Sequence, residues 1–361
     1  MYEPQSYTTK VSFNTDVEKL REHGTGSEIL SVKEFREAFA LSIDREHFAT
    51  AYTSAGTAGF GILNYQYVYN PYTGEAYRDS EGAKEALVSL YGLTFGEGGE
   101  YATLDEAYDA MTGYDMDLAR EKMAEAAAKA VEQGVWDGSS ALTIDFRVYQ
   151  NDTIYVQMFT YFNDQLQAAC VGTPLEGKVS LTMTVDADYY NTMYSGAADI
   201  IFTTWGGAAM APFTMLNQCY TDAADGTGNQ MEYGFHTENV MMTINVNGTD
   251  LTDNLQNWTN WIAGSTDQAL VGNLEAALGK FADYDYATKC AFLAACEKCF
   301  LSYYTTTPVY YRNVAALHSA RYEYATYQYV MNVGFGGLAF NTFNMDDAEW
   351  AEYVAAGNLQ Y

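Results

Sequence analysis

Basic residues are scarce in this chain of 361 residues. Lysine and arginine together number 18 against 47 aspartates and glutamates, so the formal net charge is −29. Such a charge repels the phosphate backbone of nucleic acids, and no basic stripe interrupts the acidity. It also disfavours binding to an anionic membrane surface. The composition therefore argues against a nucleic-acid-binding protein, and the high charge of one sign mainly supports solubility.

Long apolar runs are also missing. A helix needs about eighteen consecutive apolar residues to span a bilayer, and no such stretch occurs. The first residues, Met1 to Tyr7, do not form the basic and then apolar segment of a secretory signal. The sequence predicts neither a membrane-spanning helix nor a signal peptide in this chain.

Cysteine is sparse, and its spacing favours no reactive site. Cys296 and Cys299 form a C-x-x-C pair, with Cys290 six residues upstream. The pair falls inside a strongly helical stretch, 288–303, and not at a helix start, where a thiolate would be stabilised. No second C-x-x-C pair completes a tetrahedral zinc site. The favoured interpretation is buried or half-buried thiols, with redox or metal chemistry as the alternative.

Catalytic and cofactor motifs are absent as well. No G-x-S-x-G occurs, and the glycines at 334–337 are not followed by the helix that a dinucleotide loop needs. Acidic pairs such as Asp186/Asp188 and Asp283/Asp285 could serve a glycosidase or a calcium ion, but among 47 carboxylates such pairs arise by chance. We predict no catalytic residue, no metal ligand and no cofactor. The four histidines are scattered outside any metal-binding spacing; they are His23, His47, His236 and His318.

One strand and the loop after it carry the most functional information. Residues 199–204 are β-branched and aromatic, as in a buried strand, and run into Trp205, Gly206 and Gly207. This places Trp205 at the carboxyl edge of a sheet, where open α/β sheets hold ligands. The glycines let another backbone approach without a Cβ in the way. The segment is a candidate binding loop, and the alternative is a plain strand end with a core tryptophan.

Strand and helix patterns alternate in the middle of the chain. Strands are predicted at 142–149, 179–185 and 199–204, separated by helices at 153–169 and 187–194. This alternation predicts βαβ units and a largely parallel sheet. Because 361 residues are many for one core, two lobes or domains are expected.

Other elements are predicted from local signals. Helices are expected at 115–133, 273–281 and 287–304. Asn247-Gly248, inside 242–252, supplies the positive φ angles of a type I′ turn and predicts a hairpin.

An amphipathic helix is predicted from residue 32 to residue 46. Phe35, Ala38 and Phe39 give it an apolar face. Ser31 is the expected N-cap, with Glu34 completing a capping box.

Three stretches resemble one known family, in the order in which that family has them. Val11-Ser12-Phe13-Asn14-Thr15 is similar to a family strand that ends in Phe-Asn-Thr. Residues 32–46 resemble a signature helix with the pattern V-R-x-A-[LI]-x-x-[AS]-I-D-R. Residues 205–212 are similar to the loop W-G-x-D-[YF]-x-[DE]-P. The chain thus resembles the bacterial extracytoplasmic solute-binding protein family 5, the oligopeptide- and dipeptide-binding components of peptide ABC transporters.

The resemblance implies an α/β fold of the periplasmic-binding-protein-like type II class. It would comprise one lobe with a mixed, largely parallel sheet and part of a second lobe. Residues 1–30 would be a strand and connector of lobe I and the hinge, 31–304 would form lobe II with a hairpin insertion near 242–252, and 305–361 would return to lobe I. In the family, the Phe-Asn-Thr strand follows the whole first part of lobe I. The resemblance therefore implies an N-terminally incomplete member.

The same resemblance implies transport without catalysis. Such a protein captures oligopeptides, or a related small solute, non-covalently in a cleft between its lobes and delivers them to the permease subunits of an ABC importer. Full-length members are extracytoplasmic, at the cell surface or in the periplasm, and in Gram-positive bacteria they are lipoproteins. Two alternatives remain open: an extracellular hydrolase acting on glycans through paired carboxylates, and a surface interaction module.

Candidate ligand-binding residues lie in three places. The chain has 32 tyrosines, and tyrosine offers broad contact area and a hydroxyl at low entropy cost, which suits a cleft for varied ligands. The candidates are Tyr149, Gln150 and Asn151 at a strand end, Tyr189 and Tyr190 on a short helix, and Trp205, Gly206, Gly207, Ala208 and Ala209 in the loop.

In one respect the loop departs from the family. In many peptide binders the acidic residue of the W-G-x-D loop holds the ligand's α-ammonium group. Here Ala208 and Ala211 occupy the two acidic positions, and a methyl group cannot form an ion pair. A peptide must be anchored in another way, for example by Asp186 or Asp188, or the cleft takes a different solute.

Overall fold

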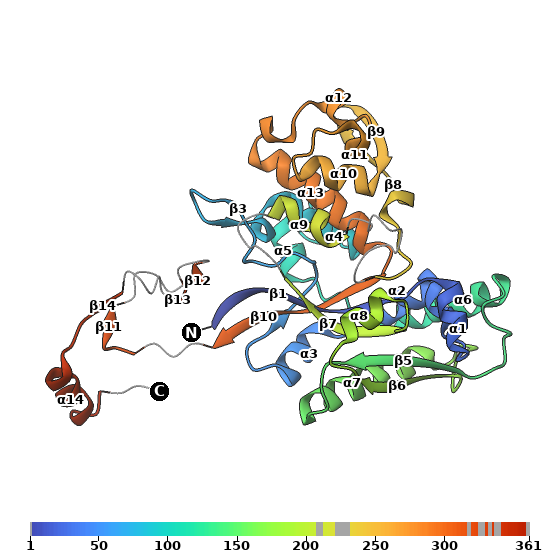
Figure 1. Ribbon diagram of the computed structural model, residues 1–361, viewed down its shortest axis with the longest axis horizontal. Helices are drawn as coiled ribbons and strands as arrows, with labels where there is room; N and C mark the ends of the chain where they lie inside the picture. The colour runs from blue at the N-terminus through green and yellow to red at the C-terminus, as the bar shows by residue number, and fades with distance from the viewer. Residues whose placement is uncertain are drawn as a thin grey trace.

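Two packed bodies and a separate C-terminal arm make up the computed structural model (Figure 1). The structure describes residues 2–206, 212–220, 232–315, 319–323, 329–330, 334–335 and 341–358. The lower body in the figure contains the main sheet, and the upper body is mainly helical. The arm carries helix α14 (Asp347–Ala355), none of whose residues is buried.

A six-stranded mixed sheet forms the centre of the lower body. Its strands in spatial order are β2 (Thr57–Ala58), β10 (Thr306–Ala315), β1 (Tyr2–Phe13), β7 (Ile200–Trp205), β5 (Leu142–Val148) and β6 (Val179–Val185). β5 pairs in parallel with both β6 and β7, whereas β1 is antiparallel to β7 and β10. Because β10, β7, β5 and β6 run in one direction, the predicted mixed and largely parallel sheet is confirmed.

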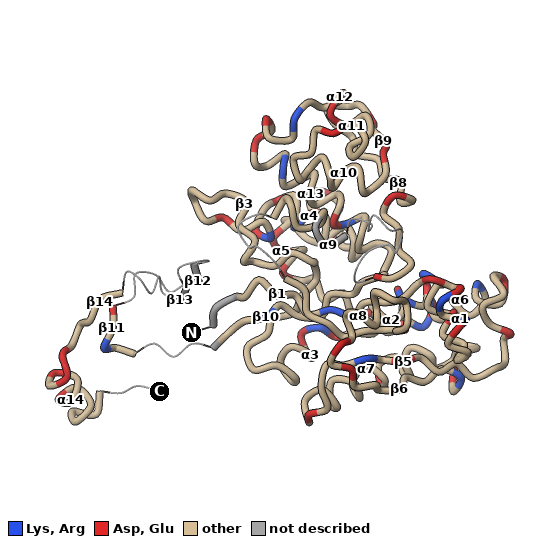
Figure 2. The backbone as a smooth tube through the Cα atoms, in the orientation of Figure 1, with Lys and Arg blue, Asp and Glu red and all other residues tan. Residues whose placement is uncertain are grey.

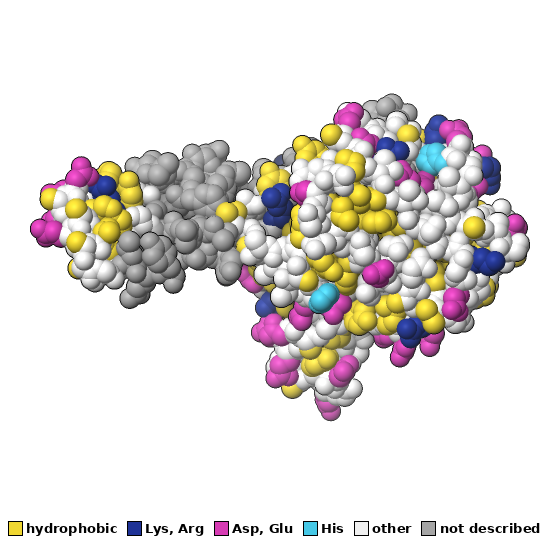
Figure 3. All heavy atoms as spheres, turned by 90° about the horizontal axis from the view of Figure 1, so that it is seen from below, with side chains coloured by type: hydrophobic (Ala, Val, Ile, Leu, Met, Phe, Trp, Pro, Cys, Tyr) yellow, Lys and Arg dark blue, Asp and Glu magenta, His cyan; other side chains and the backbone are white. Residues whose placement is uncertain are grey.

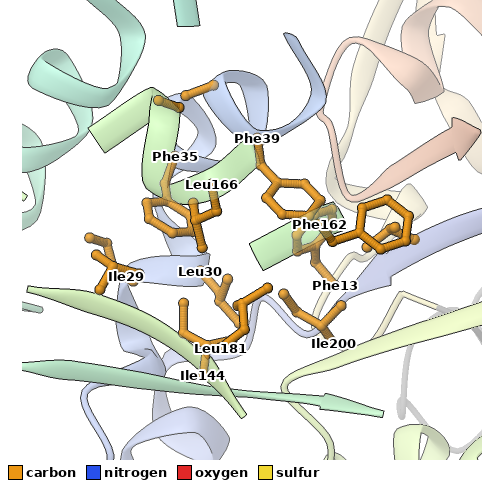
Figure 4. Packing of buried hydrophobic residues seen from close by; sticks show 14 of the residues in the cluster. Phe13, Ile29, Leu30, Phe35, Phe39, Ile144, Phe162, Leu166, Leu181 and Ile200 are labelled. Atoms are coloured by element: carbon orange, nitrogen blue, oxygen red, sulfur yellow. The ribbon is translucent and has the colours of Figure 1, made fainter. Parts of the chain in front are cut away.

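Helices cover this sheet and bury its aromatic side chains. The ring of Phe162 lies 5.3 Å from that of Phe146 on β5 and 5.1 Å from that of Phe202 on β7. Figure 4 shows Phe39, Phe162 and Leu166 gathered over the strands. Burial of these rings is the main free-energy source for the lower body. Its helical elements are α1 (Val17–His23), η1 (Ser27–Ser31), α2 (Lys33–Leu41), α3 (Arg45–Tyr52), α6 (Met116–Glu132), α7 (Thr153–Cys170) and α8 (Tyr189–Tyr194).

The upper body has a second apolar core. Trp261 lies at its centre, with its ring 6.0 Å from Trp258 and 5.1 Å from Phe292. Its helical elements are η2 (Tyr77–Asp79), α4 (Glu81–Leu90), α5 (Leu104–Asp109), α9 (Pro212–Tyr220), η3 (Thr237–Asn239), α10 (Leu255–Ile262), α11 (Gln268–Val271), α12 (Leu274–Leu278), η4 (Phe281–Asp283) and α13 (Tyr286–Leu301).

Small two-stranded antiparallel sheets complete the described structure. β3 (Val68–Asn70) pairs with β4 (Glu75–Ala76), and β8 (Met241–Val246) pairs with β9 (Thr249–Asn254). Towards the C-terminus, β11 (Tyr322–Glu323) pairs with β14 (Thr342–Phe343), and β12 (Tyr329–Val330) with β13 (Gly334–Phe335). Across the ranges described, no helix combines the length and apolar character needed to cross a membrane.

Several predicted elements are confirmed almost to the residue. β6 has the predicted bounds, and α6, α7 and β5 differ from theirs by one residue at an end or at both ends. The predicted hairpin turn is present, with φ of 53° at Asn247 and 84° at Gly248.

The predicted helix at 32–46 is confirmed over Lys33–Leu41, where Phe35, Ala38 and Phe39 are buried, but its continuation to residue 46 is wrong. The segment is divided into α2 and α3, because Asp44 adopts an extended conformation and its side chain accepts a hydrogen bond from His47 N, which starts a new helix. Ser31 is not the N-cap of α2, since its hydroxyl donates to Glu28 O at 2.7 Å. Glu34 pairs with Lys129 of α6 instead of closing a capping box.

The chain passes between the two cores several times. Residues 11–48, 119–202 and 309 contribute to the lower core, and residues 62–111, 205–216 and 235–301 to the upper one. The range 31–304, assigned above to one lobe, therefore supplies both cores. How these cores relate to the lobes of a longer protein remains a prediction.

Candidate ligand-binding site

The parallel strands β5, β6 and β7 end at the same edge of the sheet. Tyr149 directly follows β5, Asp186 follows β6, and Trp205 is the last residue of β7. Carboxyl ends of parallel strands are the common position for ligands in open α/β sheets. The sequence patterns placed most candidate residues at this edge, and the described part of the structure brings several of them together.

Three tyrosines form a cluster at this edge. The ring of Tyr189 lies 6.2 Å from Tyr149 and stacks on Tyr190 at 4.4 Å. The Tyr190 hydroxyl donates to the carbonyl oxygen of Thr204 at 2.7 Å, which fixes α8 to the end of β7. Tyr149 is 49% exposed, whereas Tyr189 is only 7% exposed. The cluster thus offers a solvent-facing aromatic surface on a packed base.

Trp205 is part of the upper core. It is 3% exposed, and its ring stacks on Tyr67 at 6.1 Å. Phe202, three residues earlier on the same strand, belongs to the lower core. β7 therefore links the two cores, and its last residue has a clear packing role. A ligand contact by the Trp205 ring remains a prediction, and in this conformation its face is covered by protein.

Gly206 allows a close approach of two backbones. A Cβ on this residue would lie 2.7 Å from Ser6 O and 2.7 Å from Tyr7 Cδ1. The predicted close approach is confirmed, and the approaching backbone belongs to β1 of the same chain. The other predicted loop residues, Gly207, Ala208 and Ala209, lie outside the described residues.

Gln150 and Asn151 lie exposed in the connection from β5 to α7. The Gln150 side chain donates to Asp152 Oδ2 at 2.6 Å. Asp152 is the N-cap of α7, because its Oδ1 accepts from Tyr155 N at 3.0 Å. The connection is held by this cap, while Asn151 faces solvent.

Asp186 has its hydrogen-bonding capacity used within the protein. Oδ2 accepts from Thr192 Oγ1 at 2.7 Å and from Arg147 Nη1 at 2.8 Å, and Oδ1 accepts from Asp188 N at 2.9 Å. The hydroxyl of Thr192 contributes most to lowering the pKa of Asp186, and burial opposes it. Such a carboxylate has little capacity left for a ligand's ammonium group. Asp188 is exposed and accepts from Asn191.

The thiols of the C-x-x-C pair have the environment of packing residues. Both lie within α13, and Cys296 belongs to the upper core. Burial raises the pKa of Cys296 well above its ordinary value and that of Cys299 to about 11. The interpretation as buried or half-buried thiols is confirmed. Among the described residues, no group of three or more His, Cys, Asp or Glu side chains could hold a metal ion.

A cavity beside the start of α7 was not found by sequence reasoning. Its volume is about 490 Å³. Its walls are the loop after α3, the first turns of α7 and the end of β10. They are formed by Ala51, Tyr52, Thr53, Ser54, Ala55, Gly56, Ile154, Tyr155, Met158, Tyr310, Arg312 and Asn313.

Tyr155 connects this cavity with the tyrosine cluster. It lines the cavity, and burial raises the pKa of its phenol, with Tyr310 adding to the rise and Arg312 opposing it. Tyr149 also adds to that rise, and Tyr155 in turn raises the pKa of Tyr189. Tyr149 directly follows β5 and Tyr155 lies in the first turn of α7, so the tyrosine cluster and the cavity flank the same connection between β5 and α7.

Comparison with known proteins agrees with this architecture. A structure of the peptide-binding pheromone receptor PrgZ aligns with 90% of this chain and 46% of its own, at 13% identity and a TM-score of 0.54. The substrate-binding domain of an oligopeptide ABC transporter from Bacillus anthracis covers 87% and 45%, at 13% identity and a TM-score of 0.51. The ABC transporter substrate-binding protein CtaP from Listeria monocytogenes covers 96% and 52%, at 14% identity and a TM-score of 0.50.

These likenesses concern the fold, and the chain spans about half the length of each of those structures. None of the curated proteins matches the chain. The model of the family described as bacterial extracellular solute-binding proteins, family 5 Middle, matches residues 1–227, which is more than half of the sequence. The chain therefore belongs to the bacterial extracellular solute-binding proteins of family 5.

Proposed function

We propose that this chain belongs to the substrate-binding component of an ABC importer. It would bind oligopeptides, or a related small solute, without chemical change and outside the cytoplasm, and present them to membrane permease subunits. The observation that carries the proposal is the family match over residues 1–227.

The geometry of the sheet edge supports non-covalent capture. Tyr149, Tyr189 and Tyr190 offer aromatic surface, and aromatic side chains can accept many ligand shapes with little loss of side-chain entropy. The candidate carboxylate Asp186 is already engaged by Arg147 and Thr192. A paired-carboxylate hydrolase would need such a group free to transfer a proton.

In the proposed mechanism, the solute binds at the edge and a second lobe closes over it. Closure excludes water, which strengthens the polar contacts to the solute. The solute shifts the equilibrium towards the closed state only to the extent that it binds that state more tightly. The closed form would be the one that the permease recognises.

Titration of the ¹⁵N-labelled chain with alanine peptides of two to five residues tests this proposal. We expect saturable shifts of backbone resonances at Tyr149, Tyr189 and Tyr190, with the peptides recovered unchanged. Cellobiose at the same concentrations is the control and should leave these resonances in place. Peptides that cause no shift there, or turnover of a chromogenic glycoside that is lost in Asp186→Asn, would contradict it.

A further inference from the structure

Arg312 stands apart from the other described arginines. In the described parts of the chain it makes no ion pair and no hydrogen bond, and its guanidinium lies 5.7 Å from the centroid of the Tyr7 ring. Every other described arginine has an oxygen partner: carboxylates for Arg21, Arg78, Arg120, Arg147 and Arg321, and backbone carbonyls for Arg36 and Arg45.

This lack of a partner is notable in so acidic a protein. The sequence holds 47 acidic residues against 18 basic ones, and acidic residues occur along the backbone of both bodies in Figure 2. On the face seen in Figure 3 they are interspersed with apolar groups. An arginine left without a carboxylate in these surroundings keeps its full capacity for an external anion.

Arg312 also lines the cavity beside α7. It follows Tyr311 on β10, so alternation along the strand puts it on the same side as Tyr310, which packs on Phe48 of the lower core. Tyr155 and Asn313 are further walls. Asp152 caps α7 by accepting from Tyr155 N and also accepts from Gln150, and within the described residues neither a hydrogen bond nor an ion pair joins it to Arg312.

The geometry points to a carboxylate subsite: the cavity at Arg312 takes a carboxylate group of the solute. A guanidinium presents two parallel N–H donors that match the two oxygens of a carboxylate. A single arginine balances one negative charge, whereas a phosphate dianion would be repelled more strongly by the chain's net charge of −29. Tyr155 would let the rest of the solute extend over Tyr149 and Tyr189. This inference rests on the proposed function and assigns the end of the solute that is anchored.

Tri-alanine and its C-terminal amide test the inference with the chain as it is. The acidity of the protein favours the amide, which carries a net positive charge, so a preference for the free acid must come from a local site. We expect the free acid to bind about fivefold more tightly than the amide. Arg312→Gln should abolish this preference, and Arg312→Lys should retain part of it. Arg120→Gln, which removes a surface arginine of α6, should leave it unchanged.

The outcomes separate this inference from the proposed function. Equal binding of acid and amide, or an unchanged preference in Arg312→Gln, would overturn the subsite while leaving peptide binding intact. If neither peptide binds, the proposed function fails for peptides. A titration with sodium acetate then tests whether Arg312 binds a carboxylate. A saturable shift of the Arg312 side-chain Nε–H signal with sodium acetate, larger than with sodium chloride at equal ionic strength, supports it. A shift no larger than that with chloride overturns it.

Discussion

At the scale of residues, a fully buried ion pair lies in the upper body. Arg78 and Glu297 are both fully buried, and Glu297 Oε1 accepts from Arg78 at 2.6 Å and from Ile62 N at 2.7 Å. Tyr77 donates to the other oxygen at 3.0 Å. This carboxylate therefore joins the loop at 61–63 to α13. A well-packed apolar pair could give the fold the same stability as this ion pair. Removal of only one partner, however, leaves an uncompensated charge in the interior and lowers the free energy of unfolding.

We expect Glu297→Ala to lower the free energy of unfolding by about 3–5 kcal/mol, because it leaves the Arg78 charge buried without compensation. Urea denaturation followed by tryptophan fluorescence measures this. Glu125→Ala is the matched control: Glu125 forms an exposed pair with Lys122, whose loss should cost at most about 1 kcal/mol. Similar losses in both variants would show that burial does not govern the effect.

The Cys299 thiol gives a second residue-scale prediction. Its pKa is raised from 9.0 to about 11 by burial. At pH 8 this lowers the thiolate fraction roughly a hundredfold. We expect iodoacetamide to alkylate Cys299 about a hundred times more slowly in the native chain than in urea, as followed by peptide mass spectrometry. Equal rates in the two states would contradict the burial of this thiol.

At the scale of elements, Asp44 separates α2 from α3 and is the N-cap of α3. Asp44 Oδ1 accepts from His47 N at 2.9 Å, as an N-cap does. Asp44→Ala should therefore destabilise the chain by about 1 kcal/mol. Ser31→Ala is the comparison, because Ser31 caps no helix N–H group, and it should change stability by less than about 0.5 kcal/mol. The reverse order of effects would favour a single helix capped at Ser31.

The turn between α6 and β5 gives a pH-dependent prediction. The backbone N–H groups of Ser140 and Ser139 lower the pKa of Asp137 from 3.8 to about 2. A depressed carboxyl pKa contributes stability above the unfolded value and loses it as pH falls through the folded one. The contribution of Asp137 should thus be present above pH 4 and vanish towards pH 2. A carboxyl carbon titration by NMR with a midpoint near 3.8 would refute it, and Asp137→Asn should remove this part of the pH dependence.

Elements with a strong local signal were predictable, and junctions were not. β6 and α6 follow from alternation and from a capped, alanine-rich pattern that depends on neighbouring residues alone. The break at Asp44 was missed because the apolar pattern continues through it. The placement of Tyr149 beside α8 could be predicted, since the ends of β5 and β6 can be read from the chain, and a binding role for these residues stays a prediction. The cavity at Arg312 could not be predicted, because it depends on residues 51–56 and Tyr155, which only the fold brings to β10.

At the scale of the whole molecule, the two bodies are joined by strands that contribute residues to both cores. β7 carries Phe202 in the lower core and Trp205 in the upper one, and Thr8 of β1 donates to Ile62 O at 2.7 Å. The backbone of β1 at Ser6 also lies close to Gly206, directly after β7. Glycine permits this approach, since the Cβ of any other residue at position 206 would collide with Ser6 O. The two bodies are therefore fixed to each other at the sheet edge where the tyrosine cluster lies.

That arrangement leads to a prediction about affinity. Tyr149 is 49% exposed, so under the proposed function a solute bound against the tyrosine cluster has one side open to water. A solute bound on one side keeps much of its surface in water, which limits the apolar area that binding can bury. We expect calorimetry with a mixed peptide pool to give dissociation constants no tighter than roughly 100 μM. Sub-micromolar binding by the chain alone would mean that the described bodies already enclose the solute, and that closure by a further lobe is not needed for capture.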